Sequence, residues 1–264
     1  MAVATRERSQ VVRAVSGEDL HALRVRMAQA RLPKRGLSLP QLAASECQQS
    51  FLAFLAHLWT VDEARAGEVR PWPMSGAWGP LWRDWETALL LCSPLLVDKT
   101  RRVMASNVVC AWDLWICLGG ADPRWPALML SSANRRVLVQ SRKLEGPGGS
   151  AEFVGRAATM LRISEERGLR KAWPGMPRWD TKFGVIECDH GGRIDAVPQG
   201  ADQVRGPGTT HLHTEELSFQ EQAQASCEAA IPALHPFGHL TAVTTPAAAT
   251  YAARIRRGDI GGDR

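Results

Sequence analysis

The stretch Leu95-Leu96-Val97-Asp98-Lys99-Thr100-Arg101-Arg102-Val103-Met104-Ala105-Ser106 joins two apolar runs of different length. The run at 95–97 has the length of a buried strand, and the run at 108–116 is long enough for a helix. A basic turn between a strand and a helix start attracts anions, because free backbone N–H groups and the positive end of the helix dipole point at the turn. We therefore interpret residues 99–106 as an altered phosphate-binding loop. The ordinary alternative is a basic surface loop.

The loop departs from the standard pattern G-x-x-x-x-G-K-[ST], in which the lysine stands next to the hydroxyl residue. Here Lys99 comes first, seven residues before Ser106, and no glycine follows it within the loop. Lys99 can still reach phosphate oxygens from the strand exit, because its side chain is long and flexible. Ser106 can still bind Mg²⁺ from the first turn of the helix.

The composition is that of a globular protein of one or two domains. Of its 264 residues, 45% are hydrophobic and 22% charged, so the chain can bury a sizeable core. A formal net charge of +5 is compatible with a polyanionic partner without identifying one. Six cysteines without a C-x-x-C pair favour a reducing compartment. Because no apolar signal region or membrane-length apolar run occurs, we expect a cytoplasmic protein without a membrane partner.

Strands alternate with helices along most of the chain. Helical spacing predicts helices within residues 10–70, including one at 41–64. Apolar runs, alternation and turn residues predict strands at 137–140, 183–188, 193–197 and 240–244, a short strand before Glu215, and helices at 151–171 and 219–230. The turn at 189–192 is expected to join two of these strands as a hairpin. This order favours an α/β fold with a mostly parallel sheet.

Two polar strand ends complete a possible nucleotide site. A phosphate loop needs a partner strand that ends in acids, one to hold Mg²⁺ and the next to polarise the attacking water. Glu215 and Glu216 stand between the expected strand and a helix, as such a pair requires. Thr244-Thr245-Pro246 ends a later strand and can sense a γ-phosphate. The ordinary alternatives are a solvated helix start and a strand end closed by proline.

The order of these motifs resembles the ATPase domain of the large terminase subunit of tailed bacteriophages, the motor that packages DNA. The matching segments are LVDKTRRVMAS at 96–106, VLVQSRK at 137–143, AEFVGRA at 151–157, AVPQGADQVRG at 196–206, EELSFQE at 215–221 and LTAVTTP at 240–246. The resemblance implies a P-loop NTPase-like α/β fold, a mostly parallel sheet flanked by helices. It also implies a helical N-terminal region at 1–70, an ATPase domain at 71–250 and a C-terminal tail at 251–264.

The resemblance also implies roles for single residues. The ATP-binding loop would comprise Lys99, Thr100, Arg101, Arg102, Val103, Met104, Ala105 and Ser106, with Lys99 on the phosphates. Ser106 and Glu215 would hold Mg²⁺, with Glu215 in a position that is usually Asp, and Glu216 would be the catalytic carboxylate. Thr244 and Thr245 would couple hydrolysis to movement. The candidates for an arginine that acts on the γ-phosphate are Arg142, Arg156 and Arg205.

The same resemblance implies cofactors and partners. ATP and Mg²⁺ would be the cofactors, and double-stranded DNA the substrate that is moved. Subunits would form a homo-oligomeric ring, with the small terminase subunit and the portal protein as further partners. The gene would belong to a phage or prophage and the protein to the bacterial host cytoplasm. We expect no nuclease activity from this chain, since only the tail at 251–264 follows the ATPase segment.

Two other functions remain open at this stage. A catalytically degenerate terminase remnant, acting at most as a nucleotide- or DNA-binding module, would account for the missing loop glycines and for Glu215 in place of Asp. A zinc-binding module is the second alternative, because Cys188-x-His190 and His211-x-His213 offer two pairs of ligands at alternating strand positions.

Overall fold

The computed structural model describes residues 46–62, 67–73, 94–99, 105–122, 135–205 and 208–259. Contacts divide the chain into two units, and every described residue belongs to the second unit, Pro40–Arg264. Most of the predicted N-terminal helical region and loop residues 100–104 lie outside the described residues.

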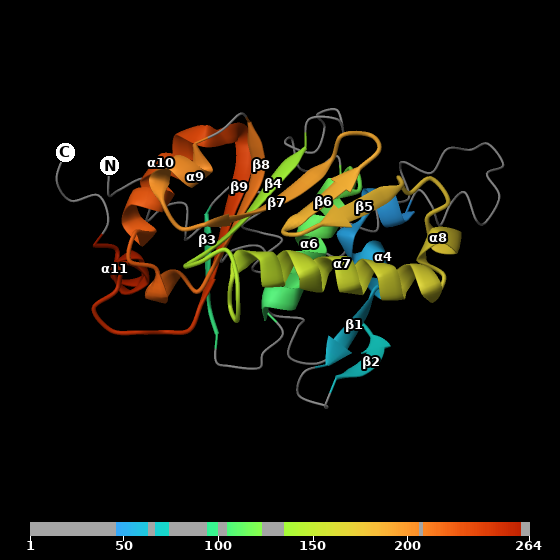
Figure 1. Ribbon diagram of the computed structural model, residues 1–264, viewed down its shortest axis with the longest axis horizontal. Helices are drawn as coiled ribbons and strands as arrows, with labels where there is room; N and C mark the ends of the chain where they lie inside the picture. The colour runs from blue at the N-terminus through green and yellow to red at the C-terminus, as the bar shows by residue number, and fades with distance from the viewer. Residues whose placement is uncertain are drawn as a thin grey trace, which may run out of the picture. The chain divides into compact units, whose positions relative to one another are not determined.

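A seven-stranded sheet forms the centre of the described structure, with the strand order β3-β9-β8-β4-β7-β6-β5 (Figure 1). The first five strands of this order run parallel, and the last two pairings are antiparallel. The bounds are β3 Leu95–Asp98, β4 Arg136–Ser141, β5 Trp179–Lys182, β6 Val185–Cys188, β7 Arg193–Pro198, β8 Thr209–Glu215 and β9 Leu234–Thr244. The predicted α/β fold with a mostly parallel sheet is therefore confirmed.

Helices cover both faces of this sheet, as a mostly parallel sheet requires. One face carries α6 (Ala105–Cys117) and α7 (Ser150–Glu166), against which α4 (Phe51–Ala56) and α8 (Leu169–Ala172) pack. The other face carries α9 (Ala201–Val204), the 3-10 turn η4 (Leu217–Phe219), α10 (Ala223–Ala233) and α11 (Tyr251–Arg257). Each face of the sheet has its own hydrophobic core: the first lies under α6 and α7, and the second under α9, η4, α10 and α11. Strand β4 contributes to both, with Val137 and Val139 in the first core and Leu138 in the second.

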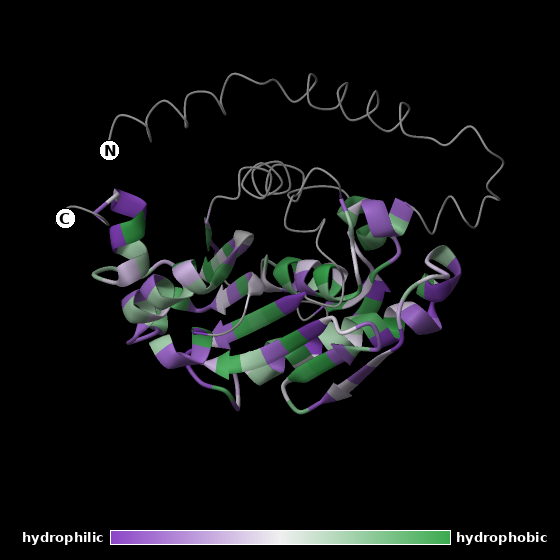
Figure 2. Cartoon of the chain, turned by 90° about the horizontal axis from the view of Figure 1, so that it is seen from above, coloured by the Kyte–Doolittle hydropathy of each residue, from purple (hydrophilic) through white to green (hydrophobic). Residues whose placement is uncertain are grey.

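The central strands are not uniformly apolar. Figure 2 shows green apolar segments of the strands interrupted by purple polar ones. Every residue of β8 is buried, although the sequence Thr-Thr-His-Leu-His-Thr-Glu contains a single aliphatic side chain. Buried polar side chains need partners, so β8 must be satisfied by groups from neighbouring elements.

The prediction of a helix at 41–64 is wrong for the residues after Ala56. Helix α4 ends at Ala56, and β1 (Trp59–Asp62) pairs with β2 (Glu68–Pro71) as an antiparallel ribbon. β1 alternates between buried and half-buried residues, and its first N–H donates to Ser164 Oγ over 2.8 Å. Pairing with β2 and anchoring on α7 therefore outweigh the helical spacing of the apolar residues.

The other predicted elements agree with the structure, with shifts at their ends. Strands β3, β4, β6, β7 and β8 and helices α6 and α7 lie where they were expected, and β6 and β7 form the predicted hairpin. Strand β5 was missed, β9 begins earlier than expected, and α10 begins later because η4 precedes it.

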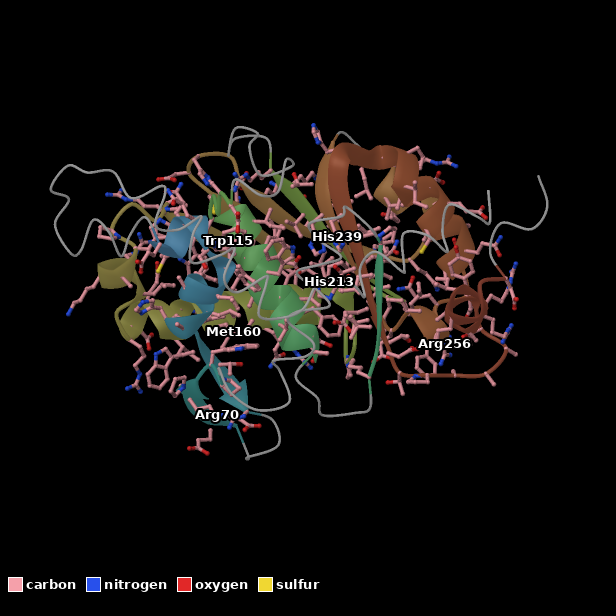
Figure 3. The ribbon with its side chains drawn as sticks, turned by 180° about the vertical axis from the view of Figure 1, so that it is seen from behind. Arg70, Trp115, Met160, His213, His239 and Arg256 are labelled. Carbon is pink, nitrogen blue, oxygen red and sulfur yellow. The ribbon has the colours of Figure 1, made fainter. Side chains whose placement is uncertain are left out.

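The segment that we delimited as a C-terminal tail begins with a helix. Thr250 caps α11 by accepting from the N–H of Ala253, and Gly258 ends it in the left-handed conformation. Ala252 is fully buried in the second core, and Arg256 pairs with Asp98 over 3.2 Å (Figure 3). Within the described residues, no helix is long and apolar enough to cross a membrane.

Candidate functional site

The carboxyl ends of the parallel strands gather the predicted motifs at one edge of the sheet. Asp98 pairs in register with Thr244, and Glu215 pairs with Val243, so β3, β9 and β8 end level with one another. Ligands of open α/β sheets bind outside the carboxyl ends of the strands, at the point where the chain connections diverge. Here β4 leads through α7 to β7, whereas its neighbour β8 leads through α10 to β9. The divergence therefore lies between β4 and β8.

Hydrogen bonds join three of the predicted motifs at this edge. The N–H of Lys99 donates to the carbonyl of Thr244 over 2.9 Å. The hydroxyl of Thr244 accepts from the N–H of Ser218 over 2.9 Å and donates to the carbonyl of Thr245 over 3.2 Å. Thr244 is completely buried. Hydrogen bonds through Thr244 thus connect Lys99, Thr245 and the turn after Glu215 and Glu216.

Glu216 holds a strained backbone conformation directly after β8. Its φ and ψ are 56° and 39°, in the left-handed region that side chains other than glycine rarely adopt. Its carbonyl accepts from the N–H of Phe219 over 2.8 Å, which closes η4. Such strain costs on the order of 1–3 kcal/mol and concentrates at functional sites. Glu216 and Ala249 are the two described residues other than glycine with positive φ.

Two rows of polar side chains face each other between α6 and β8. Ser106, Cys110 and Asp113 share one face of α6, because they are spaced by four and three residues. His211, His213 and Glu215 share one face of β8. The rows meet where Asp113 accepts from Nδ1 of His211 over 2.7 Å and from Nδ1 of His213 over 2.6 Å.

The position of Ser106 follows from the geometry of these two rows. Helix α6 runs away from the carboxyl edge and β8 runs toward it. Seven helical residues back from Asp113 cover roughly 10 Å, and the three strand residues from 212 to 215 cover about the same length. From these lengths we expect Ser106 to lie at roughly the level of Glu215 along the sheet.

The histidines explain how the polar strand β8 can be buried. His213 donates from Nε2 to Oε1 of Glu215 over 2.9 Å. His211 accepts at Nε2 from the hydroxyl of Thr241 over 3.0 Å, and that hydroxyl accepts from Nδ1 of His239 over 3.2 Å (Figure 3). The side chains of His211, His213 and Glu215 are completely buried. The network satisfies polar groups that would each destabilise the fold if unpaired.

The proton distribution in this network follows from its charges. Burial would lower the pKa of His213, but the charge of Asp113 and the hydrogen bonds to Asp113 and Glu215 raise it to about 9. Burial lowers the pKa of His211, against the effect of Asp113. Burial would raise the pKa of Asp113, but the charge of His213 and the hydrogen bonds from both histidines lower it. His213 is therefore a cation between two carboxylates, and His211 is neutral.

Glu215 keeps one carboxylate oxygen for a further ligand. Its backbone carbonyl accepts from Nε2 of Gln220 over 2.9 Å, and Oε1 accepts from His213. Within the described part of the chain, Oε2 is buried and has no hydrogen-bond partner. A buried carboxylate oxygen without a partner is unfavourable, and oxygen is the ligand that Mg²⁺ prefers. Oε2 of Glu215 therefore fits the requirements of a magnesium ligand.

The three candidate arginines lie in different surroundings. Arg142 directly follows β4, at the divergence point, and pairs with Glu221 over 2.8 Å. Arg156 on α7 pairs with Glu152 over 2.6 Å and lies 5.1 Å above the ring of Phe153. Arg205 is exposed in the segment that leads from α9 to the amino end of β8, where it pairs with Asp202. Arg142 therefore lies at the carboxyl edge of the sheet, directly after β4.

The ligand set that we considered for a zinc module is wrong. His211 and His213 pair with Asp113, whereas Cys188 lies with its Sγ 3.6 Å from Sγ of Cys117. His190 accepts at Nδ1 from the N–H of Gly192 within the hairpin turn. The two pairs do not form one site, because β8 is a central strand and the β6–β7 turn lies at the amino end of β7.

Sequence analysis missed Asp113 and Cys110. Their partners on β8 lie about a hundred positions away in the sequence, so no local pattern connects them. One signal was present: Asp113 is the single charged residue of α6 and stands within the apolar run at 108–116. A charge that is buried on all sides requires a partner of opposite charge.

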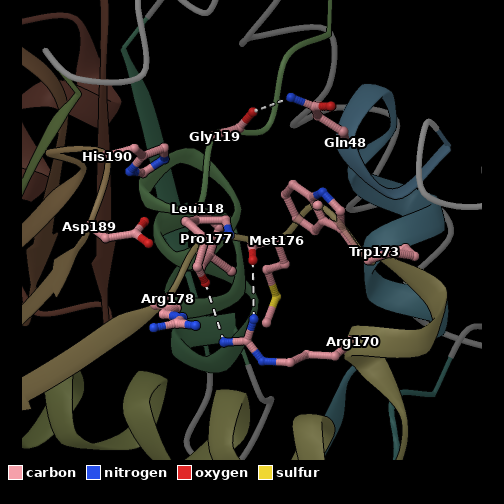
Figure 4. A pocket seen from close by; sticks show the side chains of 12 residues that line it. Gln48, Leu118, Gly119, Arg170, Trp173, Met176, Pro177, Arg178, Asp189 and His190 are labelled. Carbon is pink, nitrogen blue, oxygen red and sulfur yellow. Dashed lines mark hydrogen bonds between the residues drawn. The ribbon is translucent and has the colours of Figure 1, made fainter.

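A cleft of about 500 Å³ lies away from these residues (Figure 4). Its wall includes Leu118 and Gly119, which follow α6, so it lies at the end of that helix opposite Ser106. Arg170 points into the cleft but donates to the carbonyls of Met176 and Pro177 over 3.1 Å and 3.3 Å. The residues that line this cleft are therefore not part of the candidate site at the carboxyl edge of the sheet.

Neither a protein-family model nor a curated protein matches the chain. Among solved structures, the large terminase of bacteriophage HK97 is similar, with a TM-score of 0.53 and 13% identity over 79% of this chain and 41% of that protein. The large terminase of a thermophilic bacteriophage aligns with a TM-score of 0.37 and 10% identity, over 61% of this chain and 38% of that one. Its complex with ADP aligns with a TM-score of 0.38 and 9% identity, over 61% and 37%. The chain thus has a terminase-like α/β fold and spans less than half the length of the HK97 protein.

Proposed function

We propose that this chain is an ATP-hydrolysing motor domain that moves double-stranded DNA during phage genome packaging. The observation that carries the proposal is the pair of hydrogen bonds by which Thr244 joins Lys99 to Ser218 at the carboxyl edge. These bonds bring three motifs that are distant in sequence to one edge of the sheet, and this arrangement supports the proposal. The fold similarity to the HK97 large terminase supports the same assignment.

The residues divide the chemistry among them. Lys99 and the loop residues 100–106 bind the phosphates of ATP, and Ser106 and Glu215 hold the metal. Mg²⁺ supplies positive charge that stabilises the phosphoryl group during transfer. Glu216 orients the water that attacks the γ-phosphorus in line with the leaving oxygen. Arg142 lies where an arginine could stabilise the same charge from the neighbouring strand.

Coupling to movement follows from the position of Thr244. Its carbonyl holds the first residue of the loop, and its hydroxyl holds the turn after Glu216. A change at the γ-phosphate is thus transmitted to β9 and to η4. The net charge of +5 suits sequence-independent contacts with the DNA backbone. A ring of subunits with the small terminase subunit and the portal, in the cytoplasm of a bacterial host, completes the proposed motor.

Mg²⁺-dependent ATP hydrolysis, measured with and without duplex DNA, tests the proposal. We expect Lys99→Ala and Glu216→Gln each to abolish hydrolysis, and Lys182→Ala to leave it unchanged. Lys182 is an exposed lysine of β5, the strand at the opposite edge of the sheet from β3, and therefore serves as a matched control. Hydrolysis that survives Lys99→Ala would refute the proposed site.

A second candidate is a domain that binds nucleotide without turning it over. The observation in its favour is the complete burial of Glu215 in a pair with His213, which competes with a metal for the carboxylate. This candidate predicts that ATP and Mg²⁺ raise the melting temperature of the protein while no phosphate is released.

A further inference from the structure

Three different metal-ligating groups lie close together between α6 and β8. One ligand atom each of Cys110, Asp113 and His213 lies within 4.8 Å of the other two, and all three residues are buried. Sulfur, carboxylate oxygen and imidazole nitrogen are the three protein ligands of zinc. We propose that Cys110, Asp113 and His213 bind one zinc ion that joins the two elements.

The surroundings of these ligands match those of known zinc sites. A histidine that binds zinc usually donates its other N–H to a carboxylate or carbonyl, which fixes the ring. His213 offers Nδ1 to the site and donates from Nε2 to Glu215 over 2.9 Å. Asp113 offers Oδ2, while its Oδ1 accepts from His211 over 2.7 Å. The outer contacts are therefore in place, and zinc would replace the 2.6 Å contact between Oδ2 of Asp113 and Nδ1 of His213 and the 3.6 Å hydrogen bond from Sγ of Cys110 to the carbonyl of Phe153.

The charges balance when zinc enters. Without metal, both ring nitrogens of His213 donate to carboxylates, Nδ1 to Asp113 and Nε2 to Glu215, and Cys110 is a free buried thiol. Zinc binding releases one proton from Sγ of Cys110 and one from Nδ1 of His213. The two positive charges gained with Zn²⁺ replace the two protons lost, so the net charge of this buried region is unchanged. A buried site can accept the ion without a new uncompensated charge.

The zinc site is separate from the proposed magnesium site. Ser106 and Glu215 would hold Mg²⁺ at the start of α6, whereas Cys110 and Asp113 lie one and two turns further along the helix. The zinc proposal rests on the three ligands alone and not on the proposed function. Zinc would fix helix α6 against strand β8, which ends in the first of the paired acids.

Metal analysis of the chain without an affinity tag tests the proposal. After dialysis we expect one zinc per chain in the unaltered protein, and none in Cys110→Ser or Asp113→Asn. Cys227→Ser is the matched control, because Cys227 is a buried cysteine of the second core, and we expect it to retain the zinc. His211→Gln removes a group that orients Asp113, and we expect about a 10- to 100-fold loss of zinc affinity.

Cobalt provides a readout that does not depend on the stability of variants. Co²⁺ bound to the unaltered protein should show the near-ultraviolet absorption of a cobalt–thiolate bond, and Cys110→Ser should lose this band while keeping its circular dichroism. If Cys110→Ser does not fold, the absence of the band in the unaltered protein overturns the proposal. Zinc that is retained equally by Cys110→Ser would place the ion elsewhere and also overturn it. A chain that binds no zinc would show that the cluster is a metal-free network, while leaving the ATPase assignment untouched.

Discussion

Nε2 of His213 lies 2.9 Å from Oε1 of Glu215, and both side chains are completely buried. Because of this contact, the side chain of Glu215, the first of the two predicted acids, is hydrogen-bonded to a buried histidine and not to solvent. Its orientation therefore depends on residues of α6, which hold His213 from the other side. This dependence connects the stability of the core with the proposed nucleotide site.

The first prediction concerns Asp113. Asp113→Asn removes the charge that balances His213, and breaking a buried pair of this kind costs about 3–5 kcal/mol. We expect denaturant unfolding of the metal-free protein to show a loss of this size. Asp202→Asn is the control, because Asp202 pairs with Arg205 on the surface and should change the free energy of unfolding by less than about 1 kcal/mol. Equal effects of the two substitutions would contradict the importance of the buried network.

The second prediction concerns Tyr251, the single tyrosine of the chain. Burial, with the neighbouring Cys227 and Glu228, raises its pKa to about 12 from an ordinary value of 10. Because the pKa in the folded state is raised, this contribution to stability is complete below pH 10 and is lost as the pH rises through 12. Absorbance at a phenolate wavelength, followed against pH, should show a midpoint near 12 in the folded protein. The midpoint should return to about 10 in denaturant, and a midpoint of 10 in both states would show that α11 does not bury the ring.

The third prediction concerns the hydroxyl of Thr244. Thr244→Val leaves the N–H of Ser218 without an acceptor, which costs about 1–3 kcal/mol of stability. If this bond positions the acids, hydrolysis should fall roughly tenfold, which corresponds to an activation barrier raised by about 1.4 kcal/mol. Nucleotide affinity should remain, because the contact with Lys99 uses the backbone carbonyl.

Two further variants separate the role of this hydroxyl from simple packing. Thr244→Ser retains the hydroxyl and should restore most of the activity. Thr181→Val, at an exposed position of β5, should change neither activity nor stability appreciably. Full activity of Thr244→Val would rule out a coupling role for this side chain.

The fourth prediction uses the strained backbone of Glu216. Glycine adopts positive φ without strain, so Glu216→Gly should be more stable than Glu216→Ala by about 1 kcal/mol, while both variants lose hydrolysis. Ala249 has a φ of 55° and offers a matched comparison outside the carboxylate pair. Ala249→Gly should raise the melting temperature without any effect on hydrolysis, and a loss of activity there would weaken the argument from strain.

The fifth prediction compares Arg142 with Arg205. Arg142→Ala should lower turnover on the order of 10³-fold if this side chain acts on the γ-phosphate. Arg205→Ala should leave the basal rate intact, because Arg205 pairs with Asp202 on the segment before β8. A large loss in Arg205→Ala would instead indicate that the arginine acts on the site of a neighbouring subunit.

Much of the fold could be predicted because its signals are local. The strand before Lys99, the helix from Ala105, the hairpin of β6 and β7, and the position of Glu215 at a strand end all follow from short apolar runs and turn residues. The ribbon of β1 and β2 could not be predicted in the same way. Helical spacing continued through its residues, and the strand conformation depends on a partner strand and on Ser164 of α7.

The sequence by itself determined the alternation of strands and helices and the order of the polar strand ends, because both depend on neighbouring residues. Only the tertiary structure decided that Asp113 and Cys110 face His213, since these residues are about a hundred positions apart. The physical reason is that a buried charge must find its counter-charge wherever packing brings one within reach. In this protein the α6–β8 contact supplies it, and it thereby sets both the orientation of Glu215 and the candidate zinc site.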